Sequence, residues 1–194
     1  DVASGSGNIT LVGGNGLSIG SGVSTITGAG DIFMDAGSGA LLQSSTSTTA
    51  AGENVRLVAT GDVTVAEVIA DKISVLSSAN IITAPGASLN LSASALRLDA
   101  GQAIGTGTDP LTLSVSELSA LANTGGIFLS ESDDITVSSV GVTTDKVGAD
   151  ATTTPIADSA LSDLQSGSNG SIVLSASGSI TLDDGDSDGS VVAA

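Results

Sequence analysis

Short stretches in which apolar residues alternate with small polar ones recur from one end of the chain to the other. Clear examples are residues 8–11, 54–57, 62–65, 126–129 and 179–182. Alternation with a period of two is typical of β-strands with one buried face. A Gly, Asn or Asp usually precedes each stretch, which suits a tight turn that feeds a strand. The pattern therefore predicts an all-β chain of short strands.

The spacing of these stretches is regular. Ile127 and Ile135 are separated by the same short interval as Ile172 and Ile180. A longer interval relates Val63 to Ile81, Ile73 to Leu91, Ile9 to Ile32 and Ile32 to Val55. A chain that returns to the same register after roughly 20 residues is typical of a solenoid, whose successive coils pair in parallel.

The fold class predicted from this spacing is a parallel β-helix, or β-solenoid, of about nine coils formed by a single segment over residues 1–194. Composition favours the same fold, because equivalent positions stack directly in a narrow β-helix and aliphatic side chains suit such stacking. The alternative is a pair of β-sandwiches of the immunoglobulin or cadherin type. Sandwich cores usually contain aromatic residues, and this chain has two Phe and neither Trp nor Tyr.

Two stretches interrupt the strand pattern. Residues 43–52 form a polar connector, which we interpret as a widened turn. The longer interruption, residues 142–169, is predicted to be an inserted loop with a short helix. Within it Ile156, Ala160, Leu161 and Leu164 would share one helical face. Insertions in solenoids often lie on one side, where they can bind partners.

Charge and composition exclude several classes of function. The chain has 21 acidic and four basic residues, a net charge of −17, and no Cys or His. Disulfides, imidazole or thiolate metal sites and His-dependent triads are therefore excluded. Four cations and no stacking platform also argue against nucleic-acid binding. No apolar run is long enough for membrane insertion.

Candidate chemistry is confined to an acidic segment near the end of the chain. Asp184, Asp186 and Asp188, followed by Gly189, match the first half of a calcium loop of the form D-x-D-x-D-G. The carboxylate expected at the twelfth position of such a loop would fall beyond residue 194. The competing interpretation is an acidic turn without a ligand. The prediction is therefore a calcium site at these three residues, with no cofactor required.

We predict no catalytic residue and no organic cofactor site. Polysaccharide-cleaving β-helices need clustered acids beside a base, or a carboxylate pair that flanks a sugar. Most acids here occur one per turn, and Arg56 and Arg97 occupy strand positions that would face outward. A non-enzymatic protein is the expectation.

The repeats at 61–65, 87–93 and 170–182, with the recurring form G-(S/D)-I-x-L-x-A-x-G, resemble those of filamentous-haemagglutinin-like bacterial proteins. The resemblance covers most of the chain outside 142–169. It implies a right-handed parallel β-helix from the repeat region of a much longer protein. It also implies an extracellular or bacterial cell-surface location, with a role in adhesins, stalks or biofilm matrix fibres.

The function expected from the sequence is thus structural and adhesive. Further repeats, or other copies joined end to end, are the expected partners, because neither end shows a polar capping segment. The alternative function is specific recognition of a host or matrix glycan or protein by the 142–169 insertion, with calcium as a stabilising ion.

Overall fold

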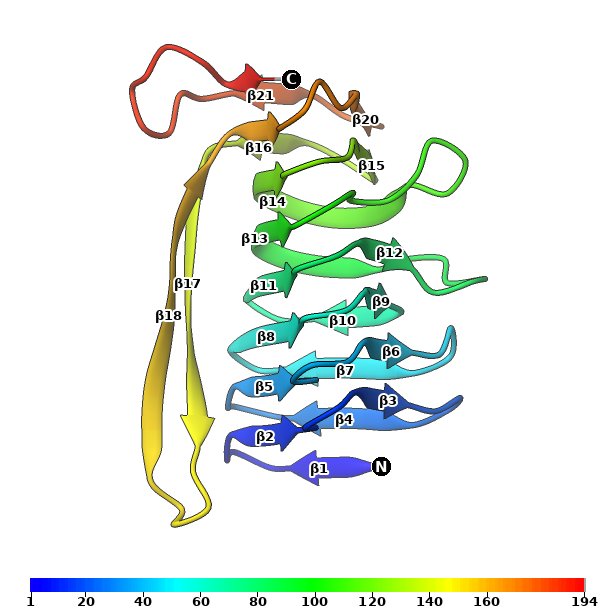
Figure 1. Ribbon diagram of the computed structural model, residues 1–194. Coiled ribbons are helices and arrows are strands. Elements are labelled where there is room, and N and C mark those ends of the chain that lie inside the picture. Colours follow the sequence, from blue (N-terminus) through cyan, green and yellow to red (C-terminus); the bar gives the residue numbers. More distant parts are fainter. Residues whose placement is uncertain (194) are drawn as a thin grey trace.

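All regular structure in residues 1–193, the range described by this computed structural model, is β-strand. The strands pair in parallel along almost the whole chain, and one long antiparallel hairpin is the main exception. This confirms the prediction of an all-β chain dominated by parallel strands. Figure 1 shows the parallel strands arranged in successive layers, with the hairpin lying along one side.

The first part of the chain builds three parallel ladders in which each strand pairs with the third strand after it. The first ladder contains β1 (Val2–Ser4), β4 (Ser24–Thr27), β7 (Thr48–Ala51) and β10 (Glu67–Ile69). The second contains β2 (Ile9–Val12), β5 (Ile32–Asp35), β8 (Asn54–Ala59) and β11 (Lys72–Ser77). The third contains β3 (Leu17–Ile19), β6 (Leu41–Gln43), β9 (Val63–Val65) and β12 (Ile81–Thr83).

Two long strands join the first ladder to the second. β13 (Leu91–Ala100) pairs with β10 through its first residues and with β11 through its last, and β14 (Leu111–Ala122) pairs along β13. The sheet is therefore nearly closed around one apolar core. We refer to all of these parallel-paired layers together as the stack.

The C-terminal layers continue the same arrangement with shorter strands. They contain β15 (Ile127–Glu131), β16 (Ile135–Val137), β19 (Leu164–Ser166), β20 (Ile172–Ala176), β21 (Ile180–Leu182) and β22 (Val192–Ala193). β20, β21 and β22 pair with β15, β16 and β19 respectively, so they form the last layer of the stack.

The register follows most of the spacings read from the sequence. Ile9 pairs with Ile32, Ile32 with Val55, and Val63 with Ile81, as their intervals predict. One expected relation is wrong. Ile73 is opposite Leu96, not Leu91, because β13 begins at Leu91 opposite Val68 of β10 and only its later part pairs with β11. The chain thus mixes a shorter and a longer repeat.

Equivalent apolar residues line up through the core. One such column begins in the second ladder and continues through β13, β14, β16 and β21. Its members are Ile9, Ile32, Val55, Ile73, Leu96, Leu118, Val137 and Leu182. From Ile32 to Val137 every member is completely buried, and the side chains are aliphatic throughout. Aliphatic side chains suit a column in which neighbours repeat at the strand spacing of about 4.8 Å. The core is thus built from like residues placed on like residues.

The polar connector expected at 43–52 is shorter than predicted. Gln43 ends β6 and is buried, where its side-chain amide donates a hydrogen bond to Thr49 Oγ1 at 2.8 Å and its carbonyl accepts one from Ala66 N at 3.0 Å. Thr48 to Ala51 then form β7. Only the few residues between these strands make a turn, because Thr48 and Thr49 are residues that favour strands and begin the pairing of β7 in the ladder.

The insertion holds a β-hairpin, and the predicted short helix is wrong. β17 (Ser139–Val147) and β18 (Thr153–Ser162) pair antiparallel, with an irregularity between Val140 and Val142. The segment from Ile156 to Leu161 lies in β18, where its helical apolar spacing has no role. β17 alternates buried and exposed residues. Pairing with this strand therefore outweighs the helical spacing in the segment opposite.

The hairpin lies along the outer face of the second ladder, as Figure 1 shows. Polar groups fix it there: Asp31 Oδ2 accepts a hydrogen bond from Asp145 N at 2.6 Å, and Thr10 Oγ1 accepts one from Val147 N at 2.8 Å. Phe33 points outward from the stack but is buried under the hairpin, with Lys146 Nζ 4.9 Å from its ring centroid. The insertion therefore covers a side of the stack that would otherwise face solvent.

Candidate functional site

Two inserted segments leave the stack at the same point of successive layers. In one layer, two short strands, β16 and β19, pair with successive parts of the single strand β14. Val137 of β16 lies opposite Leu118, and Leu164 of β19 lies opposite Ala120. The hairpin fills the interval. The next layer also has two short strands here, β21 and β22. Leu182 of β21 pairs with Val137, and Val192 of β22 pairs with Leu164. The acidic loop 183–191 fills this second interval, directly beside the base of the hairpin.

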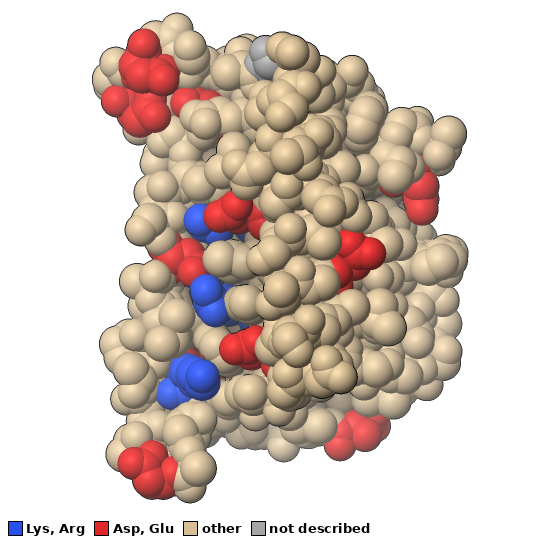
Figure 2. Space-filling view, viewed as in Figure 1, with Lys and Arg blue, Asp and Glu red and all other residues tan. Residues whose placement is uncertain are grey.

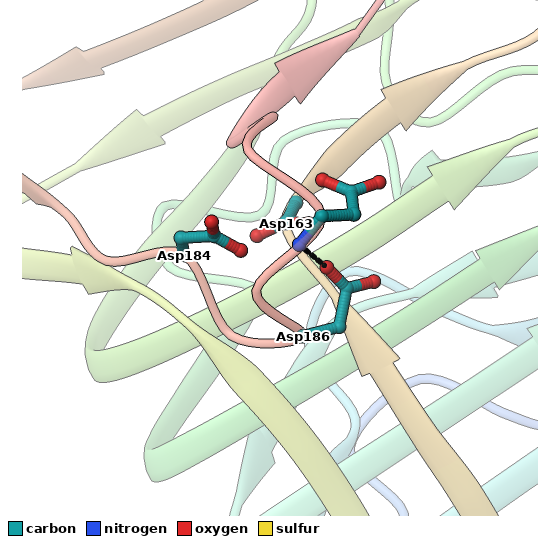
Figure 3. A group of neighbouring side chains, drawn as sticks. Asp163, Asp184 and Asp186 are labelled. Atoms are coloured by element: carbon teal, nitrogen blue, oxygen red, sulfur yellow. Dashed lines mark hydrogen bonds between the residues drawn. The ribbon is translucent and has the colours of Figure 1, made fainter.

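This placement brings four carboxylates together. Three of them belong to the acidic loop, and the fourth comes from the last residue of the hairpin segment before β19. We call this group the aspartate cluster: Asp163, Asp184, Asp186 and Asp188. One carboxylate oxygen from each residue lies within 4.8 Å of the corresponding oxygens of the others. Figure 3 shows Asp163 and Asp184 turned toward each other, with Asp186 beside them.

Backbone N–H groups orient the loop carboxylates. Gly189 N donates to Asp184 Oδ2 at 3.0 Å, Asp188 N to Asp186 Oδ1 at 3.2 Å, and Ser190 N to Asp188 Oδ1 at 2.7 Å. Each loop carboxylate thus has one oxygen held by the backbone. Ser187 adopts a left-handed conformation with φ of 63°, and the turn there lets the loop fold back on itself.

Asp163 differs from the loop aspartates because it is buried, with only 1% of its surface exposed. Its φ of 72° is left-handed, a conformation that Asp and Asn tolerate better than most residues. Gly185 N lies 3.5 Å from Asp163 Oδ1, which is a long hydrogen bond, and Oδ2 has no hydrogen-bond partner. Burial raises the pKa of Asp163 above its usual value, and the charges of Asp186, Asp184 and Asp188 raise it further.

The sequence identified three members of the cluster and missed the fourth. Asp184, Asp186 and Asp188 do lie together, as the calcium-loop pattern predicts, but Asp163 supplies the additional carboxylate in place of a twelfth loop position. A signal for Asp163 was present. The repeats at 127–137 and 172–182 align, and this alignment places the two interruptions that follow Val137 and Leu182 opposite each other.

No basic side chain neutralises the cluster within residues 1–193. The two ion pairs found within these residues join Arg56 to Asp158 and Arg97 to Asp99, and neither involves the cluster. On the face drawn in Figure 2, the basic side chains form a short column among acidic ones, and other acidic atoms gather at the upper left corner. The aspartate cluster is therefore a concentration of negative charge without a counterion from the protein.

The other charged residues singled out in the sequence have structural contacts. Arg56 and Arg97 face outward from their strands, as expected, but the hairpin covers them. Arg56 pairs with Asp158 through two hydrogen bonds of 2.7 and 2.8 Å, and Arg97 Nε donates to the carbonyl of Ser159 at 2.9 Å. Both cations therefore serve to hold the hairpin against the stack.

Comparisons with protein-family models, curated proteins and solved structures found no match for this chain. Within the described range, the chain contains no helix with the length and apolar character needed to cross a membrane.

Proposed function

We propose that the chain is a β-solenoid segment with a structural and adhesive role in a secreted or cell-surface fibre, and that it is not an enzyme. The observation that carries this proposal is that the apolar columns change from buried to exposed at the last layer of the stack. Val137 is completely buried, whereas Leu182, the next member of its column, is 54% exposed. Leu182 occupies a core position that lacks a covering layer.

The same change occurs in the neighbouring columns. Leu164 is buried and its partner Val192 is exposed, and Ile135 is buried while its partner Ile180 is exposed. These apolar residues lie on one layer, next to strand edges whose backbone groups are free to pair. A further layer with the same alternation would bury these side chains and would also provide hydrogen-bond partners for the backbone groups of the strand edges. We therefore propose end-to-end stacking, either with further repeats or with another copy.

The surface of the stack supports a structural role better than a catalytic one. One surface hollow, of about 390 Å³, is lined mainly by small and aliphatic residues, and its one carboxylate, Asp99, is paired with Arg97. A net charge of −17 makes copies of such a segment repel one another, so association requires an apolar surface such as the exposed residues of the last layer. The extracellular bacterial setting rests on the resemblance of the repeats to filamentous-haemagglutinin-like proteins.

Receptor recognition by the 142–169 segment stays a prediction. The hairpin turns its inner side to the stack and uses Asp158 and Ser159 to bind arginines there. Its outer side and the turn between β17 and β18 are the parts left for a glycan or protein partner.

Sedimentation velocity over a range of protein concentrations tests the stacking proposal. We expect the chain to form elongated assemblies, and Leu182→Ser to shift it toward the monomer. Leu42→Ser is a matched control, since Leu42 is similarly exposed, at 47%, but lies on the side of the stack in β6. A wild-type chain that stays monomeric at every concentration, or equal effects of the two variants, would contradict the proposal.

A further inference from the structure

We propose that the aspartate cluster is a binding site for one hard divalent cation of the size of calcium. The proposal goes beyond the structural role above and does not depend on it. It assigns Asp163, at the end of the hairpin segment, as a ligand together with the three carboxylates of the acidic loop.

Unsatisfied buried oxygens point to a ligand at this position. Asp163 Oδ2 and Asp184 Oδ1 are both buried, and neither has a hydrogen-bond partner. A carboxylate oxygen removed from water without a partner is energetically unfavourable. Both residues belong to the cluster, so a single cation bound there would satisfy the two oxygens together.

The chemistry of the donors selects the class of ion. All four residues offer carboxylate oxygens, and the chain has no His or Cys that would favour zinc or copper. Four carboxylates concentrated in one place are typical of sites for hard cations, which prefer oxygen ligands. The backbone hydrogen bonds to Asp184, Asp186 and Asp188 hold these groups in position without using all of their oxygens.

The coordination preferences of the two ions favour calcium over magnesium. Calcium binds oxygens at about 2.3–2.6 Å, so two ligands on opposite sides of the ion are about 4.6–5.2 Å apart, whereas magnesium requires about 4.0–4.2 Å. The cluster oxygens lie within 4.8 Å of one another. This limit admits calcium, whose coordination is flexible, whereas magnesium demands near-ideal octahedral geometry and usually keeps several waters instead of binding in an all-protein site.

Such an ion would connect two parts of the chain that are distant in sequence. Asp163 ends the segment that carries the hairpin, while the loop aspartates lie between β21 and β22 of the last layer. The bound ion would hold the loop against the hairpin base, and so would stabilise the pairing of β22 with β19. Without it, mutual repulsion of the carboxylates loosens this end of the stack.

Isothermal titration of the metal-free 194-residue chain with calcium chloride at pH 7 tests the proposal. We expect one ion per chain, at least tenfold weaker binding of magnesium, and a higher melting temperature with calcium in calorimetry at matched ionic strength. Hydrogen exchange should slow in residues 183–193 when calcium is added. Calorimetry is preferred to intrinsic fluorescence because the chain has no Trp or Tyr.

Asp163→Asn is the decisive variant, because Asn tolerates the left-handed backbone at this position. We expect calcium binding at least tenfold weaker and loss of the calcium-dependent rise in melting temperature. Asp133→Asn, which removes one exposed charge near the same layers, should bind calcium like the wild type. Absence of any binding heat and melting shift at 10 mM calcium would overturn the proposal, as would unchanged calcium affinity in Asp163→Asn.

Discussion

Arg56 and Asp158 are far apart in sequence and form a bidentate ion pair. Arg56 Nε donates to Asp158 Oδ2 at 2.8 Å, and Arg56 Nη2 donates to Asp158 Oδ1 at 2.7 Å. Both side chains are largely buried, at 13% and 6% exposure. The pair joins β18 of the hairpin to β8 of the stack. It links the insertion directly to the layers beneath it.

We expect Asp158→Ala to destabilise the fold by about 3 kcal/mol, because it leaves the Arg56 guanidinium buried without its partner. Urea unfolding followed by far-ultraviolet circular dichroism measures the change. The double variant Arg56→Met, Asp158→Leu should lose much less, since no unpaired charge remains. Equal losses in the single and double variants would show that packing of the hairpin, and not the ion pair, determines its attachment.

Gly52 marks a place where the layers approach too closely for a side chain. A methyl group there would meet the backbone carbonyl of Gly28 in the layer before, and no flexible side chain is available to move aside. We expect Gly52→Ala to lower the free energy of unfolding by about 1–3 kcal/mol.

Gly14→Ala is the matched control, because no atom lies within 4 Å of the methyl group it adds. The free energies of unfolding of the two variants are compared with that of the wild type in urea. A loss of stability in Gly14→Ala as large as that in Gly52→Ala would attribute the effect to the general cost of replacing glycine in a turn.

The strands and much of their register could be predicted from the sequence because each strand carries its own local pattern. Ile9, Ile32 and Val55 head similar alternating stretches, and they pair as their spacing predicts. The hairpin could not be predicted in the same way. Its second strand contains Ile156, Ala160 and Leu161 at helical spacing, and only pairing with β17, together with the arginines of the stack, makes it extended.

Three of the four residues of the candidate metal site could be predicted from the sequence, for a related reason. Asp184, Asp186 and Asp188 are close in sequence, so a local motif reveals them. Asp163 joins them only because successive layers interrupt the same strand position, which is a property of register between repeats. A lone Asp before Leu164 carries no local signal for this role.

The turn of the hairpin provides a prediction on pH. Asp150 accepts hydrogen bonds from Thr152 Oγ1 at 2.7 Å and Thr152 N at 3.1 Å, and these lower the pKa of Asp150 below its usual value of 3.8. A lowered pKa means that the folded state favours the ionised form. The contribution to stability is therefore present above pH 3.8 and is lost as the pH falls through the lower, folded-state pKa.

Thr152→Val removes the side-chain donor, which is the largest cause of the shift, so we expect the pKa of Asp150 to rise toward 3.8. A carbon-detected NMR titration of the Asp150 carboxyl measures it. Thr153→Val, an exposed change at the start of β18, should leave the pKa of Asp150 unchanged. An identical titration curve in Thr152→Val and wild type would contradict the assignment to this hydrogen bond.

Salt should strengthen end-to-end association of the chain. Two copies that stack each bring a net charge of −17, and the acidic loop lies at the same end as the exposed Leu182 and Val192. The Debye length falls from roughly 30 Å at 0.01 M to roughly 8 Å at 0.15 M, so repulsion between the charged ends weakens while apolar burial is retained. Sedimentation velocity in sodium chloride from low to physiological concentration should therefore show larger assemblies as salt rises, and Leu182→Ser should show a smaller response. Association that weakens with added salt would instead mean that attraction between opposite charges holds the copies together, which an apolar end layer does not predict.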